Sequence, residues 1–311
     1  MTNDGDERRE TGDMSAAFQL GVITDEISQD IDDAIRIARR YGLDALELRS
    51  VDGEQLYRLS DLRIEEIGAA IRAAGLKVSG LSAPVFKCNL RNEEEIAEHR
   101  ETLTRYADLA QRLGTRFVRG FSFWADGPLE EAFDDIVREL KSVVPILERH
   151  GVIYALEADP AVYASNAAKA AALIRAVDSP YIQGLYDPGN DLWDPDREVP
   201  YPDGYEALKG RICHIHLKDA VKQGDHTEAV AIGKGQVDYA GLLHRLVQEG
   251  YDGYLVVETH YRLQSSLTEE QLKRPAGYAF SEGGEEATTD CLNSLFELLE
   301  RSSISISKSG S

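Results

Sequence analysis

The chain has few cysteines, few basic residues and no long hydrophobic run, and each shortage excludes a class of protein. Its three cysteines are widely spaced, which excludes a disulfide framework and a CxxC metal site. Lysine and arginine number 34 against 55 aspartates and glutamates, so the net charge is −21 and a phosphate-binding basic face is not expected. No stretch approaches the roughly 18 apolar residues of a membrane span, and residues 1–17 have no apolar segment of the kind found in a signal peptide. We therefore expect a cytoplasmic protein without nucleic-acid or membrane partners.

Both ends of the chain are polar, whereas the middle is rich in apolar residues. Residues 1–17 are polar and acidic, and the last ten are rich in serine. The composition, 42% hydrophobic over 311 residues, is ample for a large core. We expect a disordered arm over residues 1–17, one folded domain over 18–301 and a flexible tail over 302–311.

Apolar runs typical of strands alternate along this domain with stretches whose apolar residues have helical spacing. The predicted strands cover residues 18–24, 43–48, 76–82, 115–121, 152–157, 181–187, 211–217 and 253–258. The predicted helices cover residues 30–41, 61–74, 93–113, 129–150, 166–177, 239–248 and 285–301. Eight such strands predict an α/β fold, a single (β/α)8 TIM barrel. An open doubly wound sheet is the alternative. The dinucleotide-binding form of that fold has a GxGxxG motif after the first strand, and this sequence has none there.

Ionisable residues stand at the ends of four successive predicted strands: Glu157, Asp187, His216 and Glu258. In a barrel, groups at the carboxyl ends of strands meet at one mouth. His214, His216 and Lys218 share one face of their strand because side chains alternate. His216 lies nearer the rim, so it is the preferred ligand, with His214 as the alternative.

Three carboxylates and an imidazole at one mouth repel each other unless a cation holds them together. We therefore predict one divalent metal ion bound by Glu157, Asp187, His216 and Glu258. Ligation by oxygen with a single nitrogen favours Mn²⁺, Mg²⁺ or Co²⁺, and Zn²⁺ stays open. Such a metal would stabilise the enediolate formed when a carboxylate removes a proton beside a substrate carbonyl.

Further polar and aromatic residues follow the strand ends and are candidates for contact with substrate. They are Glu47, Lys87, Arg119, Trp124, Asn190, Lys218 and His260. A phosphorylated substrate would need a cluster of N–H groups, and only the loop Gly233 to Gly235 is suited to that. Glycines at such a turn are more often loop geometry, so we expect an unphosphorylated substrate.

Several motifs resemble the sugar phosphate isomerase/epimerase family of xylose isomerase-like TIM barrels. They are GVITDEISQD after the first strand, ALE at 155–157, YDPGN around Asp187, HIHLKD at 214–219, IGKGQVD at 232–238 and VVETHY at 256–261. The resemblance extends from about Phe18 to Glu300 and implies the four-ligand metal site given above. It also implies that Glu157 and Glu258 are the acid and base on opposite faces of a carbohydrate substrate. Asn190 and Asp159 stand where several relatives have histidine, which weakens transfer of their substrate contacts.

Three functions remain open at this point. The first is a metal-dependent isomerase or epimerase of a sugar, keto-sugar or polyol-derived substrate. The second is a lyase with the same enolising step, such as an inosose or dehydroshikimate dehydratase or a keto-glycoside eliminating enzyme. The third is a non-catalytic carbohydrate-binding barrel. Barrels of this kind often associate through their helices, so a homo-oligomer is a further expectation without a surface assigned to it.

Overall fold

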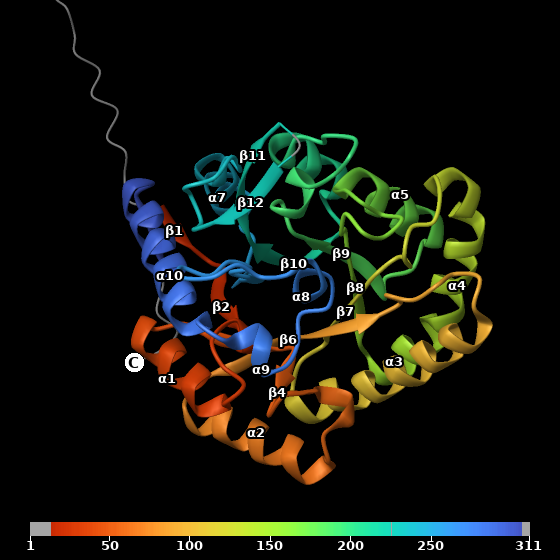
Figure 1. Ribbon diagram of the computed structural model, residues 1–311, viewed down its shortest axis with the longest axis horizontal. Coiled ribbons are helices and arrows are strands. Elements are labelled where there is room, and N and C mark those ends of the chain that lie inside the picture. Colours follow the sequence, from red (N-terminus) through yellow and green to blue (C-terminus); the bar gives the residue numbers. More distant parts are fainter. Residues whose placement is uncertain (1–13, 225, 307–311) are drawn as a thin grey trace, which may run out of the picture.

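A closed barrel of eight parallel strands forms the centre of the computed structural model, which describes residues 14–224 and 226–306 (Figure 1). Neighbouring strands in the ring follow each other in sequence, and β13 closes on β2 with Leu255 beside Leu20. The ring consists of β2 (Gln19–Ile23), β3 (Ala45–Leu48), β6 (Lys77–Val85), β7 (Phe117–Gly120), β8 (Ile153–Glu157), β9 (Ile182–Tyr186), β10 (Ile212–Leu217) and β13 (Tyr254–Val257). This confirms the predicted TIM barrel and each of its predicted strands.

Helices surround the barrel and return the chain from the end of one strand to the start of the next (Figure 1). The long ones are α1 (Ile31–Tyr41), α2 (Asp61–Ala73), α3 (Glu93–Leu113), α4 (Leu129–His150), α5 (Ala167–Val177), α7 (Tyr239–Gln248) and α10 (Gly284–Arg301). Side chains at Asp30 and Asn92 cap the first turns of α1 and α3. Gly42 and Gly114 end the same helices at φ of 65° and 76°, a conformation that glycine adopts without strain.

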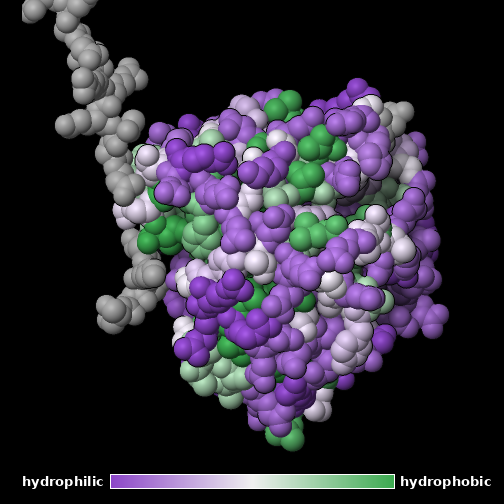
Figure 2. Space-filling model, turned by 60° about the vertical axis from the view of Figure 1, so that its left-hand side comes forward, coloured by the Kyte–Doolittle hydropathy of each residue, from purple (hydrophilic) through white to green (hydrophobic). Residues whose placement is uncertain are grey.

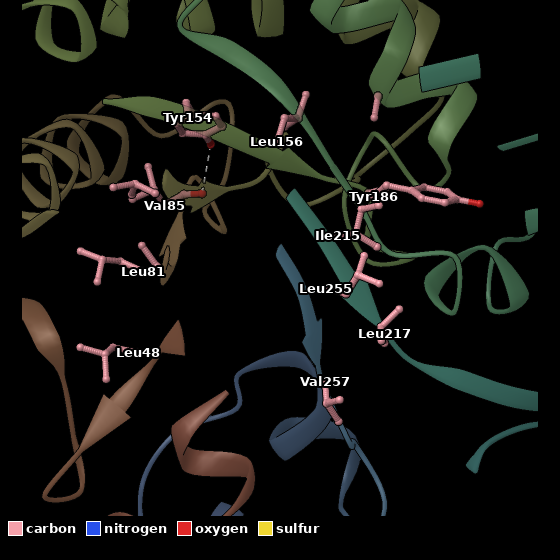
Figure 3. Packing of buried hydrophobic residues seen from close by; sticks show 14 of the residues in the cluster. Leu48, Leu81, Val85, Tyr154, Leu156, Tyr186, Ile215, Leu217, Leu255 and Val257 are labelled. Carbon is pink, nitrogen blue, oxygen red and sulfur yellow. Dashed lines mark hydrogen bonds between the residues drawn. The ribbon is translucent and has the colours of Figure 1, made fainter. Parts of the chain in front are cut away.

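The two faces of each barrel strand have different roles. Residues such as Leu156, Ile215 and Leu255 belong to the large apolar cluster, whose members from neighbouring strands are drawn in Figure 3. Ala155 and Val256 have the opposite parity and are 1% and 0% exposed, yet they lie outside that cluster. They therefore fill the inside of the barrel, which is the face that carries the polar site residues.

The two ends of the described chain pair with each other, which corrects the expected limits of the domain. Met14–Ala16 (β1) forms a parallel pair with Ile304–Ile306 (β14), so the arm predicted over 1–17 and the tail predicted over 302–311 are partly folded. Backbone hydrogen bonds between the two segments stabilise them, and Ala16 and Ile304 are buried. The remaining residues of both predicted segments, 1–13 and 307–311, lie outside the described part of the chain.

Smaller elements lie in the segments that connect the barrel strands. Two antiparallel hairpins, β4 (Ser50–Val51) with β5 (Glu54–Gln55) and β11 (Asp219–Gln223) with β12 (His226–Val230), follow β3 and β10. The short helices are α6 (Tyr205–Leu208), α8 (Glu269–Lys273) and α9 (Tyr278–Ser281). The outer surface in Figure 2 is mostly hydrophilic, with separate small hydrophobic groups. Within residues 14–224 and 226–306, no helix has the length and apolarity required to cross a membrane.

Candidate metal centre

The four residues predicted as metal ligands come together at the carboxyl end of the barrel. Glu157 ends β8, Asp187 and Glu258 directly follow β9 and β13, and His216 lies in β10. One ligand atom of each lies within 4.8 Å of the others. All four side chains are buried, with at most 2% of their surface exposed. Strand ends that are far apart in sequence thus form one compact polar site.

His216 directs one ring nitrogen into this site. Its Nδ1 lies 3.2 Å from Glu157 Oε1 and 3.6 Å from Glu258 Oε2. Lys218, also on β10, places Nζ 2.9 Å from Asp187 Oδ2 and 2.7 Å from Glu258 Oε2. The same ammonium donates a hydrogen bond of 3.0 Å to Asn190 Oδ1. Lys218 and Asn190, both predicted to contact substrate, therefore adjoin the four candidate ligands.

Two carboxylate oxygens of this site have no hydrogen-bond donor, although both are buried. They are Asp187 Oδ2 and Glu258 Oε2, which lie at ion-pair distance from Lys218 without the direction of a hydrogen bond. Burial raises the pKa of Asp187, and the charges of Glu258 and Glu157 add to this effect against the opposing charge of Lys218. A divalent cation would supply the missing partner and remove the conflict among the carboxylates. The donor set therefore fits a metal ion.

Each of the two glutamates is held by an arginine. Arg119 Nη1 lies 3.2 Å from Glu157 Oε2, and Arg49 Nη1 donates to Glu258 Oε1 at 2.8 Å. Burial alone raises the pKa of Glu157, but the charge of Arg119 and the hydrogen bond from His216 outweigh it and lower the pKa. For Glu258, burial is likewise outweighed, with Lys218 as the largest opposing charge. Both glutamates are therefore kept ionised, as a proton acceptor requires.

Arg49 belongs to a buried ionic cluster that the sequence patterns did not predict. Its guanidinium binds Asp25 at 2.9 Å and Glu26 at 2.8 Å in addition to Glu258. Asp25 and Glu26 follow β2 and are 0% exposed. The rule that identified Glu157 and Glu258 as strand-end carboxylates, applied to the first strand, would have found both. His260 Nδ1 lies 3.4 Å from both Glu26 and Glu258, so His260 adjoins this cluster.

Lys87 and Trp124, two of the residues predicted to contact substrate, lie around the rim. Lys87 forms an ion pair with Asp159 at 2.7 Å, and its ammonium lies 4.2 Å from the Phe121 ring centre and 5.4 Å from that of Trp124. Trp124 is half-buried. Arg119 lies deeper, between Glu157 and Glu258. Cationic, acidic and aromatic groups therefore meet above the candidate metal site.

Glu47 has contacts that do not fit its predicted role in binding substrate. It lies below His216, is 1% exposed, and both carboxylate oxygens are engaged. Oε2 accepts from His214 Nε2 at 2.6 Å, and Oε1 accepts from His216 Nε2 at 3.0 Å and from the Ser82 hydroxyl. The β3–β6 register shifts between Leu46 and Glu47, which changes the position of Glu47 relative to a regular strand end.

The segment between β13 and α10 covers the mouth. The backbone carbonyl of Lys273, in α8, accepts a hydrogen bond of 3.1 Å from Lys87 Nζ, and Arg274 lies over the Trp124 ring. The ring centre of Phe280, in α9, lies 4.7 Å from the guanidinium carbon of Arg49 and 4.9 Å from that of Arg262. Figure 1 shows α8 and α9 over the ring of strands. The candidate ligands are buried partly because of this cover.

The loop considered for a phosphate is occupied by a side chain of the protein itself. Asp219 accepts hydrogen bonds from the backbone N–H groups of Gly233, Gly235 and Val237 at 2.9, 2.9 and 3.2 Å. A Cβ atom at Gly235 would lie 2.1 Å from Asp219 Oδ1, so glycine is required for this close approach. These N–H groups are not free to bind an anion.

The fold and the four convergent residues agree with a comparison against known families. The model of a family described as xylose isomerase-like TIM barrel matches residues 35–281. The chain belongs to this family. The match covers most of the barrel and includes Glu157, Asp187, His216 and Glu258. The predicted family membership is thereby confirmed.

Solved structures with the same fold include several enzymes of this family's architecture. A D-psicose 3-epimerase with D-tagatose from Clostridium cellulolyticum H10 has 15% identity and a TM-score of 0.70, with 91% of this chain and 99% of that chain covered. The IOLI protein with a binding zinc atom has 20% identity and a TM-score of 0.70, with the same coverage. The probable 3-DHS dehydratase AsbF from Bacillus anthracis has 17% identity and a TM-score of 0.63, with 88% and 99% covered. At these identities the likeness establishes the fold.

Proposed function

We propose that the protein is a divalent-metal-dependent isomerase or epimerase of a small unphosphorylated sugar, keto-sugar or polyol-derived substrate. The convergence of three carboxylates and one imidazole nitrogen, with two buried carboxylate oxygens lacking donors, carries this proposal. Glu157, Asp187, His216 and Glu258 would hold the ion, with Mn²⁺, Mg²⁺ or Co²⁺ favoured by the oxygen-rich donor set and Zn²⁺ as the alternative. When bound, the metal would polarise the substrate carbonyl and so acidify the neighbouring C–H.

Glu157 and Glu258 are the proton-transfer groups in this proposal. Each keeps one oxygen on an arginine and has the other beside His216 Nδ1, so each is an ionised base in a buried site. One glutamate removes the proton from the carbon beside the carbonyl. Inversion of that carbon requires the other glutamate to take up a proton from water and deliver it to the opposite face, so that the two glutamates end with their protonation states exchanged. Return of the abstracted proton to the adjacent carbon by the same glutamate isomerises the substrate. Arg119 and Arg49 orient the two carboxylates.

The substrate class follows from the groups at the rim. Lys87, Asp159 and Trp124 offer a cation, a carboxylate and an aromatic face, a combination that suits hydroxyl groups and the C–H face of a sugar. The loop at Gly233 to Gly235 binds Asp219, which supports an unphosphorylated substrate. We also keep a cytoplasmic location as a proposal, because all three cysteines are free and such thiols persist in a reducing compartment.

A lyase is the second candidate, because the fold is shared with the probable 3-DHS dehydratase AsbF. Loss of a leaving group and return of a proton both begin with the same proton removal, so Glu157 and Glu258 would have the same first role. Product mass separates the two reactions. Isomerisation or epimerisation leaves the mass of the substrate unchanged, whereas a dehydratase lowers it by one water.

The first test is metal content, measured by plasma mass spectrometry on protein purified without a histidine tag. We expect one divalent ion per chain in the wild type and its loss in His216→Ala. With that metal supplied, Glu157→Gln and Glu258→Gln are each expected to abolish turnover of a keto-sugar panel. Glu139→Gln, which alters a buried carboxylate on α4 bound to Arg100, is the matched control and should keep both metal and turnover. Full activity in either catalytic variant, or a wild type that takes up no cation, would contradict the proposal.

A further inference from the structure

A second buried polar group adjoins the candidate metal ligands and shares His216 with them, and its other members have no part in the reaction proposed above. It consists of Glu47 on β3, Ser82 on β6, and His214 and His216 on β10. All four are at most 1% exposed. His216 belongs to both groups, because its ring lies between them.

The two ring nitrogens of His216 face different carboxylates. Nδ1 points to Glu157 and Glu258 in the candidate metal site, whereas Nε2 lies 3.0 Å from Glu47 Oε1. A neutral imidazole carries one proton, and only the nitrogen without it can bind a metal. The partner of the other nitrogen decides which one that is. A carboxylate has no proton to donate, so Glu47 holds the proton on Nε2, and Nδ1, which faces Glu157 and Glu258, is the nitrogen that a metal ion between these carboxylates would bind.

We propose that Glu47 is a positioning residue that holds His216 in the tautomer and orientation in which Nδ1 binds the metal. This inference rests on the proposed metal site. Within the described part of the chain, the side-chain hydrogen bonds of Glu47 go to His214, His216 and Ser82, so Glu47 acts on the site through His216. Metal-binding histidines commonly depend on such a carboxylate partner, and its loss weakens metal affinity by about 10- to 100-fold.

The rest of the buried group fixes Glu47 itself. Oε2 accepts from His214 Nε2 at 2.6 Å, and the Ser82 hydroxyl donates to Oε1 beside the bond from His216. Three donors from two other strands thus prevent the carboxylate from rotating away from His216. A fixed acceptor is what the role requires.

Glu47, His214 and His216 also satisfy the distance condition for holding a metal ion of their own. Their contacts favour hydrogen bonding instead, because both oxygens of Glu47 and the Nε2 atoms of both histidines are already paired at 2.6 to 3.0 Å. In the candidate site above, by contrast, Asp187 Oδ2 and Glu258 Oε2 have no donor. A second ion here would therefore have to break existing hydrogen bonds.

Cobalt(II) titration of the whole chain tests the role of Glu47, with visible absorption as a readout independent of activity. In Glu47→Gln one oxygen becomes an N–H₂ group, so His214 and His216 no longer both have an acceptor. We expect about 10- to 100-fold weaker cobalt binding and, at saturation, an altered visible spectrum. Glu47→Leu removes both acceptors and should weaken binding at least as much; if it does not fold, Glu47→Gln still decides. Glu139→Gln controls for loss of a buried carboxylate elsewhere and should bind cobalt like the wild type.

Each outcome has a separate meaning. A wild type that binds no cobalt overturns the proposed metal site, and this inference with it. One ion per chain with unchanged affinity and spectrum in Glu47→Gln overturns only the positioning role. Equal weakening in Glu47→Gln and Glu139→Gln reduces Glu47 to a structural residue, and a second ion that disappears in Glu47→Gln makes it a ligand instead. Weakening confined to the Glu47 variants supports the proposal.

Discussion

Replacing Arg49 with methionine removes the cation from the buried cluster beside the candidate site. Arg49 is 1% exposed and binds Asp25, Glu26 and Glu258 at 2.8 to 2.9 Å. Methionine keeps much of the side-chain length but none of the charge, so three buried carboxylates lose a partner. Breaking a buried ion pair in this way costs about 3–5 kcal/mol, because a charge is left without compensation. A typical domain has only about 5–15 kcal/mol of stability in total.

We expect the loss of stability to stay near the cost of one buried ion pair, although three carboxylates lose a partner. Lys218 Nζ remains 2.7 Å from Glu258 Oε2, and Arg262 Nη1 remains 3.6 Å from Glu26 Oε2. Among the described residues, the Asp25 carboxylate keeps the hydrogen bond from the Ser50 hydroxyl, and it can take up a proton, since burial already raises its pKa to about 6 with Arg49 present. Protonation limits the cost of that third carboxylate. We therefore expect Arg49→Met to lower the free energy of unfolding by about 3–5 kcal/mol at neutral pH.

Urea unfolding followed by tryptophan fluorescence measures this loss, and Arg36→Met is the matched control. Arg36 also binds two carboxylates, Asp33 at 2.9 Å and Glu285 at 2.7 Å, but its side chain is 51% exposed. Water screens that pair, so Arg36→Met is expected to leave the urea midpoint nearly unchanged. Equal midpoint shifts in the two variants, or no shift in Arg49→Met, would refute the claim that burial gives the Arg49 cluster its strength.

Two further predictions concern a buried acid and a tightly packed glycine. Burial raises the pKa of Asp25 from 3.8 to about 6, so the folded chain binds more protons than the unfolded chain between those values, and stability falls as pH rises through them. Relative to Asp25→Asn, the wild type should lose about 2 kcal/mol between about pH 4 and pH 6 in urea unfolding, out of about 3 kcal/mol over the whole transition; parallel profiles would contradict this. A Cβ atom at Gly120 would lie 1.9 Å from the Tyr154 ring, so Gly120→Ala should lower stability by about 1–3 kcal/mol in thermal unfolding. Adding Tyr154→Leu should recover part of that loss, and a wild-type melting temperature for Gly120→Ala alone would disprove the steric argument.

The strands and the four candidate ligands could be predicted because they follow from local patterns. Alternation of apolar and polar residues reveals the face of a strand, and the position of a turn reveals its end. Glu157, Asp187 and Glu258 satisfy both criteria, and a barrel brings such positions to one mouth. Their convergence could be predicted without knowing the register between neighbouring strands.

The depth of Glu47 within the barrel could not be predicted in the same way, whereas the lower position of His214 follows from its place two residues before His216 on the same face of the strand. Glu47 lies next to a register shift in the β3–β6 pair. The alternation of apolar and polar residues around Glu47 did not indicate this irregularity. The pairing of Met14–Ala16 with Ile304–Ile306 is likewise a contact between distant segments, and it cannot be predicted from two short polar sequences.

That terminal pairing also settles where the chain can be attached to something else. Met14–Ala16 precedes the first residue of β2, so it lies at the end of the barrel opposite the carboxyl ends of the strands, and Ile304–Ile306 lies beside it. Both linkage points therefore face away from the mouth that holds Glu157 and Glu258. An immobilised or fused form, joined before Met14 or after Ile306, would present its mouth to the solution whichever terminus is used.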